Sequence, residues 1–318
     1  MFSLTKYFFK QTLISFYKEK DKFIVQKKII KNNKTLSTEI FEFEDDEFKK
    51  FITSSFIDNP QTYISTIIDT FNQGIVNSCN HSRYKELGIN IDNIKILCIK
   101  TFSIFIGLYE LNEFKKFMQN YKVDYLFSPY LLIHYNTTHQ KNTLYLLITQ
   151  SFACMIIYKD KKIQYSNISQ FEDNDDTANI NVQNESEDEL DDIDDLVDDI
   201  DDIESLDDDL DSLDDINDID DISDLDMMNS NSSDENISTQ LENTKNELNT
   251  IEFVKNSIKD YYENYDADFL EKIEVIYNKD LSKNLIKSLE EETLLEINST
   301  EIDILSAINE LALKEINV

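Results

Sequence analysis

Apolar stretches separated by charged turns open the chain. Three of them, Leu13–Tyr17, Phe23–Ile30 and Thr35–Phe43, are divided by the turns Lys18–Lys22 and Lys31–Lys34. Runs of β-branched and aromatic residues bounded by lysine- and asparagine-rich turns are typical of strands. The sequence therefore predicts a three-stranded meander near the N-terminus.

Helical spacing follows the meander. A short helix is predicted from Asp45 to Lys50, and Gln61–Ser78 carries isoleucine and phenylalanine at steps of three and four residues, which predicts an amphipathic helix packed on a sheet. Ile94–Phe105 is nearly continuous in apolar residues and is predicted to be a buried central strand. The other elements predicted up to residue 165 are a helix at Leu111–Tyr121, a strand at Val123–Phe127, a helix or strand at Leu131–Tyr135, and a second meander formed by Thr143–Ile148, Phe152–Tyr158 and Lys162–Tyr165.

The C-terminal part alternates between helix and strand patterns. The predicted elements are a helix at Leu241–Tyr262 with Leu248, Ile251, Val254 and Ile258 facing inward, a strand at Lys272–Tyr277, a helix at Leu281–Leu289, a strand at Leu294–Ile297 and a helix at Ile304–Lys314. This order is typical of an α/β arrangement. We therefore predict an α+β protein built from α/β-type halves.

A strongly acidic tract interrupts the two patterned parts. Residues 171–226 contain 28 of the 64 acidic residues of the chain and no lysine or arginine, so most of the net charge of −34 lies there. Aspartate is a poor helix former and like charges repel along a helix, so the free tract is predicted to be disordered. The predicted organisation is an N-terminal α+β lobe (1–170), a disordered acidic insert (171–239) and a C-terminal α/β segment that completes the second lobe (240–318).

Aliphatic residues recur every three or four positions within the insert. A solvating linker has no need of such a stripe, although a plain linker remains the alternative interpretation. A docking segment that meets a basic protein groove explains the stripe better. The candidate partner-binding residues are Leu190, Ile193, Leu196, Ile200, Ile203, Leu206, Leu210, Leu213 and Ile216.

Charge and cysteine content restrict the function classes. The acidic chain is expected to be repelled by nucleic acid and by anionic lipid, which favours a basic protein partner. Three cysteines without close pairing argue against a disulfide framework and indicate a reducing compartment. The longest apolar runs fall below the ~20 residues that span a bilayer. We therefore expect a cytoplasmic protein that does not itself span the membrane.

The order of elements, together with Tyr261-Tyr262, the strand Ile273–Ile276 and the closing Leu311-Ala312-Leu313, resembles the actin-like fold of the PilM family and of the related cytoplasmic domain of type II secretion platforms. The resemblance covers both patterned parts, with the acidic insert placed after the second meander. It implies a two-lobed, ribonuclease H-like fold. It also implies a scaffolding role in pilus assembly, secretion or DNA uptake, at the cytoplasmic side of the inner membrane.

The resemblance also implies where nucleotide would bind, and the sequence departs from that pattern. The family holds phosphate with two Asp-x-Gly hairpins and a Gly-Gly turn, because glycine lets backbone amides approach phosphate closely. The corresponding turns here are Lys18–Lys22, Thr149–Ser151 and Asn278–Asp280, none of which contains glycine. We therefore predict a degenerate pseudo-ATPase with no catalytic, cofactor-binding or metal-binding residues. An assembly ATPase that cradles phosphate without glycine, and an unrelated acidic binding protein, are the alternatives.

Other chemistry has weaker support. Cys79, His81, His134 and His139 are a borderline zinc-ligand set whose spacing fits no finger motif. A Gly-x-Ser-x-Gly elbow is missing from the sequence, and the acidic insert lacks the glycine that a calcium-binding EF-hand loop requires.

Overall fold

The computed structural model describes residues 10–19, 21–32, 34–118, 121–138, 141–171, 234–265, 267–278 and 281–316, and for 234–243 it describes the backbone alone. All nine candidate partner-binding residues, from Leu190 to Ile216, lie outside these ranges. The described residues before 172 and those from 243 onward belong to one compact unit.

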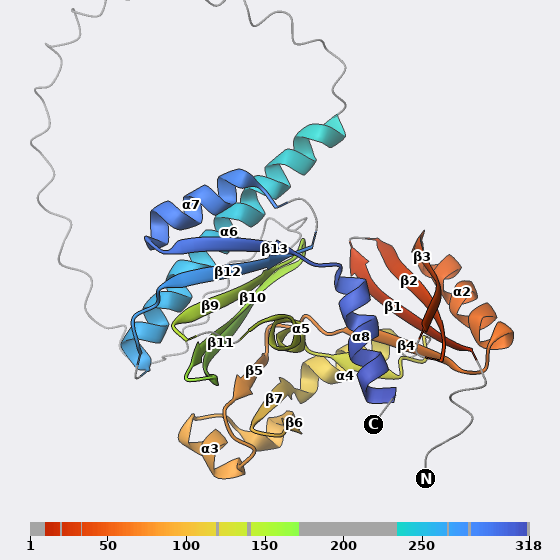
Figure 1. Ribbon diagram of the computed structural model, residues 1–318, viewed down its shortest axis with the longest axis horizontal. Coiled ribbons are helices and arrows are strands. Elements are labelled where there is room, and N and C mark those ends of the chain that lie inside the picture. The colour runs from red at the N-terminus through yellow and green to blue at the C-terminus, as the bar shows by residue number, and fades with distance from the viewer. Residues whose placement is uncertain are drawn as a thin grey trace, which may run out of the picture. The chain divides into compact units, whose positions relative to one another are not determined.

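The first sheet has five strands in the order β3-β2-β1-β4-β8. Its strands are β1 (Gln11–Glu19), β2 (Lys22–Lys31), β3 (Lys34–Phe43), β4 (Thr62–Ile67) and β8 (Tyr125–Phe127). The first three are antiparallel, whereas β4 runs parallel to β1 and β8 parallel to β4. The predicted N-terminal meander is confirmed, and β3 lies at the outer edge of this sheet (Figure 1).

The second sheet repeats the same order, β11-β10-β9-β12-β13. Its strands are β9 (Thr143–Ile148), β10 (Phe152–Lys159), β11 (Lys162–Gln170), β12 (Lys272–Tyr277) and β13 (Glu296–Glu301). Three antiparallel strands are again extended by two parallel ones. Two consecutive halves with this topology define the actin-like, ribonuclease H-like fold, so the predicted fold class is confirmed.

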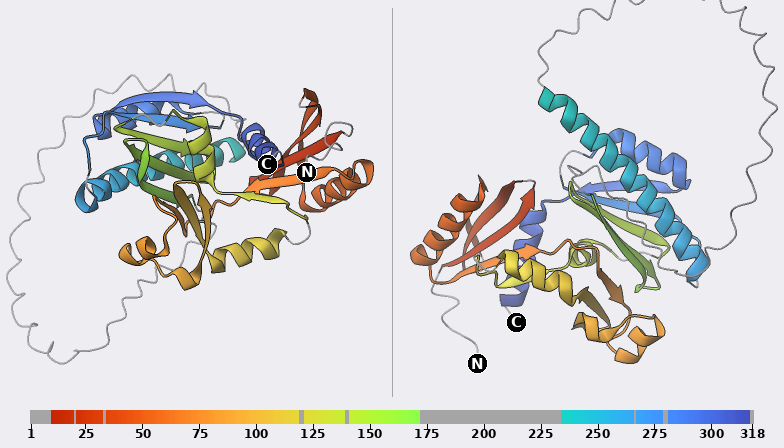
Figure 2. Two further views of the ribbon diagram at one scale, coloured as in Figure 1. Left: turned by 60° about the horizontal axis from the view of Figure 1, so that its bottom comes forward. Right: turned by 180° about the vertical axis from the view of Figure 1, so that it is seen from behind.

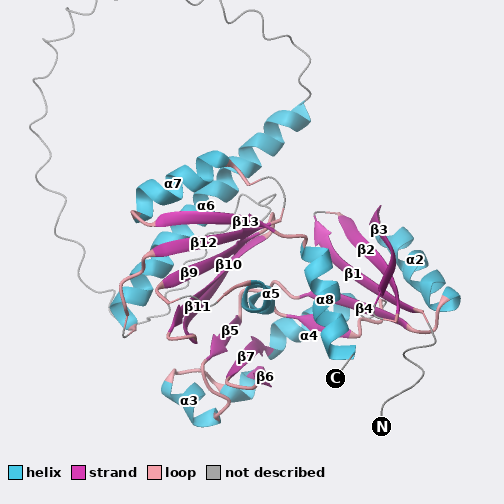
Figure 3. Ribbon diagram, in the orientation of Figure 1, coloured by secondary structure: helices cyan, strands magenta, loops and turns pink. Residues whose placement is uncertain are grey.

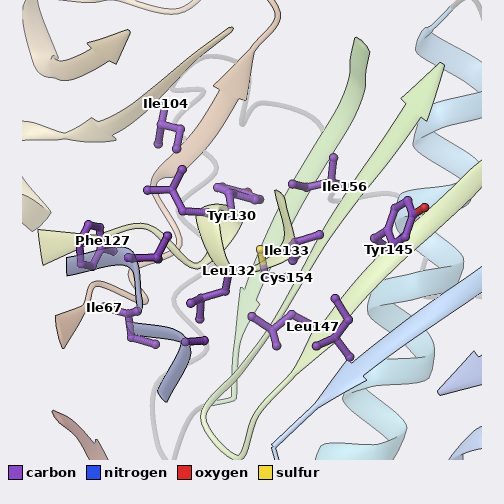
Figure 4. Packing of buried hydrophobic residues seen from close by; sticks show 14 of the residues in the cluster. Ile67, Ile104, Phe127, Tyr130, Leu132, Ile133, Tyr145, Leu147, Cys154 and Ile156 are labelled. Carbon is purple, nitrogen blue, oxygen red and sulfur yellow. The ribbon is translucent and has the colours of Figure 1, made fainter. Parts of the chain in front are cut away.

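Helices cover both faces of the second sheet (Figures 2 and 3). They are α5 (Pro129–Asn136), α6 (Asp234–Asn264), α7 (Lys283–Thr293) and α8 (Ile304–Ile316). On one face α6 and α7 contribute Val254, Tyr261 and Leu289 to a buried cluster. On the other, Tyr130 and Leu132 of α5 pack among the inward side chains of β9 and β10 (Figure 4). Burial on both faces explains why β9 and β10 are apolar almost throughout.

The first sheet is covered by α2 (Asp45–Asp58) and α4 (Leu108–Met118) on one face and by α8 on the other. An aromatic core holds α2 in place, since the ring of Phe48 stacks on Phe23 with centroids 4.4 Å apart and lies 4.8 Å from Phe16. On the opposite face, Ile316 of α8 packs with Leu13 of β1. The closing helix therefore extends the core of the second half onto the sheet of the first.

Local sequence explains where several helices begin. Pro129 occupies the first turn of α5, where its missing N–H has no helical partner to lose. The Ser282 hydroxyl caps α7 by accepting from the amides of Asn284 (3.1 Å) and Leu285 (3.4 Å). Asp303 caps α8 through the amide of Ser306 at 3.1 Å. These local features therefore fix the first residues of α5, α7 and α8.

A third sheet of three strands lies between β4 and β8 in sequence. It comprises β5 (Gln73–Val76), β7 (Phe102–Gly107) and β6 (Ile94–Ile99) in the order β5-β7-β6, with α3 (His81–Glu86) and the 3₁₀ turn Ile91–Asn93 in the β5–β6 connection. The single central strand predicted at Ile94–Phe105 is wrong. The chain turns at Lys100, whose φ is 52°, and forms an antiparallel hairpin in which Leu97 is 58% exposed.

The helix predicted at Gln61–Ser78 is also wrong. Thr62–Ile67 forms β4, a central strand parallel to β1, and Gln73–Val76 forms β5. The Thr-Tyr-Ile-Ser-Thr-Ile sequence of β4 is β-branched at four of its six positions, and such residues lose side-chain freedom in a helix and pack well in a strand. Pairing with β1 therefore outweighs the helical spacing of the isoleucines.

Smaller corrections concern the ends and faces of the C-terminal elements. α6 begins at Asp234 rather than Leu241, and Leu248 is exposed, because the buried seam of the helix follows Thr250, Val254 and Tyr261. Leu294, predicted to start a strand, is instead the left-handed C-cap of α7, with φ 57°. The predicted helix at Asp45–Lys50 continues to Asp58 as α2. Among the described residues, no helix is both long and apolar enough to cross a membrane.

Candidate functional site

The candidate site lies where strand ends of the two halves meet. Tyr17 is near the end of β1 and Asn278 follows β12, and the Asn278 amide donates a hydrogen bond to the Tyr17 hydroxyl at 3.3 Å. Burial raises the pKa of Tyr17, the bond from Asn278 lowers it, and the carboxylates of Glu19 and Asp303 raise it further. The phenol is therefore neutral at physiological pH and joins the two halves as a polar contact.

A second contact involves the loop after β4. Asp69 directly follows this loop's first residue, Ile68, and the Ser151 hydroxyl of the β9–β10 turn hydrogen-bonds its carboxylate. Burial raises the pKa of Asp69, while its own backbone N–H and Ser151 oppose that shift. A carboxylate thus stands beside the turn that would hold phosphate in an actin-like nucleotide site. It disfavours an anion there.

The β9–β10 turn satisfies the amides of Thr149, Ser151 and Phe152 internally. The Thr149 hydroxyl oxygen accepts from the N–H groups of Ser151 (3.2 Å) and Phe152 (3.0 Å). The Thr149 N–H donates to the Phe152 carbonyl at 2.9 Å, and the Ser151 carbonyl accepts from Phe171 at 2.7 Å. The Ser151 and Phe152 amides are among the backbone donors that a phosphate would require from this turn. In this chain a threonine side chain takes the place that phosphate oxygens would occupy as acceptor.

Lys18 and Lys22 of the β1–β2 turn are directed away from the Tyr17–Asn278 contact. The Lys18 ammonium lies 5.3 Å from the ring centroid of Phe117 on α4, a cation–π contact on the opposite face of the sheet. The Lys22 ammonium lies 3.8 Å from the Glu42 carboxylate on β3. Neither described cation of this turn is therefore placed to neutralise a nucleotide phosphate.

A buried polar network joins α8 to β2 of the first sheet. The Gln26 amide donates to Asp303 and Ser306, both at 3.0 Å, and its carbonyl oxygen accepts from Asn309 at 3.0 Å. Gln26 and Asn309 are almost completely buried. On β1, the Ser15 hydroxyl donates to the Leu305 carbonyl at 2.8 Å. These directional bonds fix the position of α8, which carries the Asp303 end of the site.

The structure separates the residues considered for zinc. Cys79 forms a disulfide with Cys98 of β6, their Cα atoms 5.5 Å apart, so the expectation of unpaired cysteines is wrong for this pair. The hairpin at Lys100, which the sequence pattern did not predict, brings the two cysteines together. His134 bonds to the Tyr158 hydroxyl at 3.0 Å, and His139 lies outside the described residues. The described residues contain no cluster of three or more potential metal ligands.

Sequence reasoning missed most of this site. It identified the three turns, but not Tyr17, Asp69 or Asn278 as contacts between halves. A polar residue shortly after a buried strand, as Asp69 lies two residues beyond the end of β4, is the signal that could have indicated one of them. That signal depends on recognising β4 as a strand, which the helical spacing of its isoleucines concealed.

Two family models match the chain. One, described as Domain of unknown function (DUF8341), matches residues 144–317, and the other, described as Domain of unknown function (DUF8569), matches residues 8–134. The N-terminal match ends within the last turn of α5 and the C-terminal match begins at the start of β9, close to the junction of the two halves. A comparison with curated protein sequences gave no match.

Solved structures with a related arrangement share little sequence with the chain. A Bacteroides thetaiotaomicron protein with an actin-like ATPase fold and unknown function is 12% identical, with a TM-score of 0.45 and 98% of each chain covered. A PilM–PilN type IV pilus biogenesis complex is 6% identical, with a TM-score of 0.49 and coverage of 93% of this chain and 89% of the other. The ethanolamine utilization protein EutJ of Carboxydothermus hydrogenoformans is 7% identical, with a TM-score of 0.39 and coverage of 96% and 89%.

Proposed function

The chain belongs to the family of the Domain of unknown function (DUF8341), and we propose that it acts as a non-enzymatic scaffold of a membrane-associated assembly. Its two halves present surfaces to protein partners, and its degenerate phosphate turns serve to hold the halves together. Assemblies of the type IV pilus, type II secretion or DNA-uptake class fit this role. The PilM–PilN complex is an example in which a protein of related fold works as one component of a pair.

One observation carries the proposal. The amides of Ser151 and Phe152, which an actin-like ATPase would use for phosphate, are bonded to the Thr149 side chain. To bind nucleotide, the turn would have to break both bonds and bring phosphate beside the Asp69 carboxylate. Losing two hydrogen bonds costs about 1–3 kcal/mol, before the unfavourable charge is counted. The Ser151 and Phe152 amides are therefore expected to stay bonded to Thr149 rather than to bind phosphate.

The partner-binding element of the proposal is the acidic insert, 171–239, between the lobe 1–170 and the segment 240–318. Its stripe of aliphatic residues, from Leu190 to Ile216, docks on a basic protein surface, and the protein works in the cytoplasm at the inner membrane. The charge of the tract supports a basic partner, because long-range attraction steers such pairs together. Replacing the nine aliphatic residues with serine preserves that charge. If the insert docks through its aliphatic stripe, this replacement should abolish binding to the basic partner. If the insert is a plain solvating linker, the replacement should change nothing.

Calorimetric titration with Mg-ATP tests the proposal directly. We expect no saturable heat for the full chain, and no ATP hydrolysis above the rate of a matched buffer blank. Saturable binding at micromolar concentration would overturn the scaffold proposal and support an assembly ATPase. A thermal-shift scan with Mg-ADP and Mg-GTP in parallel guards against a change of nucleotide preference.

Deleting residues 174–231 tests the insert separately. If the insert only contacts partners, thermal unfolding of the remaining chain stays within about 2 °C of the full chain, since few native contacts are removed. A loss of several degrees would show that the insert contributes to the stability of the folded body. Neither result depends on nucleotide, so the two parts of the proposal fail independently.

A further inference from the structure

Strand β3 is an open edge of the first sheet. It pairs only with β2, and its other side meets no strand among the described residues. On the face that α8 covers over β1, β2 and β4, the helix does not extend to β3. Ile40, which pairs with Gln26 on that face, is therefore 58% exposed, and Leu36, at the register shift between β2 and β3, is 53% exposed. Long edge strands with exposed aliphatic side chains are sites where another chain can add a strand.

The same strand pair carries unneutralised positive charge. Lys28 on β2 and Lys31 and Lys34 at the β2–β3 turn take part in no ion pair among the described residues. Lys28 lies opposite Thr38, next to Ile40 on the same face, and Leu36 lies close by at the register shift. In a chain with a net charge of −34, this is a local basic and aliphatic surface. We refer to these five residues, Lys28, Lys31, Lys34, Leu36 and Ile40, as the β3 patch.

From these observations we infer that the β3 patch binds an extended peptide of alternating acidic and aliphatic residues, which adds to β3 as a further strand. Alternate residues of an added strand fall on one face, at a spacing of two residues. Aliphatic side chains on the face of Ile40 would cover that residue. The acidic side chains that alternate with them would fall on the other face, where Lys31 and Lys34 lie at the exposed hairpin end. The free backbone groups of β3 would supply the main-chain hydrogen bonds of β-augmentation.

The free backbone groups of β3 favour a peptide over other anionic partners. A nucleic acid or an anionic membrane would use the lysines, but it would leave the backbone N–H and C=O groups of β3 unpaired. The middle of the other face of the hairpin is already occupied, since Lys27 stacks over the Phe51 ring of α2 at 5.7 Å. The open edge, the face of Ile40 and the hairpin end remain for a partner. This surface is separate from the proposed insert docking, so either can fail without the other.

Fluorescence anisotropy with the full chain tests the inference. The probe is a nine-residue fluorescein-labelled peptide of alternating glutamate and valine, and the control peptide alternates lysine and valine. We expect saturable binding of the acidic peptide only, weakened by salt. The double variant Leu36→Asn/Ile40→Asn, and separately Lys31→Glu/Lys34→Glu, should each weaken binding at least about tenfold, as loss of central contacts does. The exposed control Leu248→Asn on α6 should leave the affinity unchanged.

Hydrogen–deuterium exchange supplies the structural readout. On addition of the acidic peptide, amides within residues 34–43 should exchange more slowly, while those of α7 do not change. Two results would overturn the inference: acidic-peptide binding that is unaffected by both double variants, or no binding at all. Vesicles containing phosphatidylserine provide the third arm. Vesicle binding that requires Lys31 and Lys34, without protection of 34–43, would assign the patch to a membrane surface instead.

Discussion

Removing the Thr149 hydroxyl is the sharpest test of how the β9–β10 turn is held. In Thr149→Val the side chain keeps its shape, so packing is preserved. The turn loses the acceptor for the Ser151 and Phe152 amides, at 3.2 and 3.0 Å, and a donor to the Phe152 carbonyl at 2.9 Å. The backbone bond from the Thr149 N–H to that carbonyl remains. The substitution thus isolates the side-chain contribution.

The magnitude follows from exposure. Ser151 is partly exposed, so water can satisfy its amide and the loss there is small. Phe152 is 1% exposed, and its amide would be left unsatisfied in the interior. Leaving one buried donor unpaired costs about 1–3 kcal/mol, so we expect a loss of about 1–2 kcal/mol in the free energy of unfolding. For a folded body of this size, that lowers the unfolding temperature by roughly 3–6 °C.

Urea unfolding followed by circular dichroism measures this loss, with Thr53→Val as the control. Thr53 also has a bonded hydroxyl, to the Lys49 carbonyl, but it lies on the exposed face of α2 and should change stability by less than about 0.5 kcal/mol. If Thr149→Val lowered the free energy of unfolding as little as the control does, the Thr149 hydroxyl would not be holding the two amides. The turn would then be free to receive phosphate, and the case against nucleotide binding would fail with it.

Three further predictions concern other parts of the structure. Gln26→Met should cost about 2–3 kcal/mol because it leaves the Asn309 amide unpaired, and adding Asn309→Leu should recover much of that loss in a double-mutant cycle followed by urea unfolding. Burial raises the folded-state pKa of Asp69, so its contribution to stability is complete at low pH and is lost as pH rises through that value. Asp69→Asn should therefore gain stability relative to the parent as pH rises from about 4 to 7, and parallel melting curves would contradict this. Gly107→Ala should lower stability by no more than about 1 kcal/mol in thermal melts, because the new methyl group meets only the movable ends of the Glu110 and Asn72 side chains; a larger loss would show that their hydrogen bond holds them in place.

The three-stranded meanders were predictable because all their turns except Thr149–Ser151 are marked by charge. Lys18–Lys22 and Lys159–Lys161 interrupt β-branched runs so clearly that strand limits follow within a few residues. The turn at Lys100 has a single charged residue, and Lys100-Thr101 is not a dipeptide that favours a left-handed conformation. The hairpin and the Cys79–Cys98 pair that depends on it were therefore not visible in the sequence.

The contacts between the halves were unpredictable for a different reason. Tyr17 and Asn278 are far apart in the chain, and so are Gln26 and Asn309. No local pattern reports such pairs, because they exist only once both sheets have formed. Periodicity could at best identify which residues are buried. It could not identify the buried polar groups that would find each other.

The pairing of β9 with β12 has a consequence for synthesis of the chain. Thr143 of β9 pairs with Lys272 of β12, whereas Thr12 of β1 pairs with Thr62 of β4. At roughly 5–20 residues per second, a ribosome needs on the order of ten seconds between making β9 and making its parallel neighbour. During that interval the apolar edge of β9 has no native partner, although the first sheet can already be complete. A nascent chain of this protein is thus most vulnerable to misassociation, and most dependent on chaperones, while its second half is being translated.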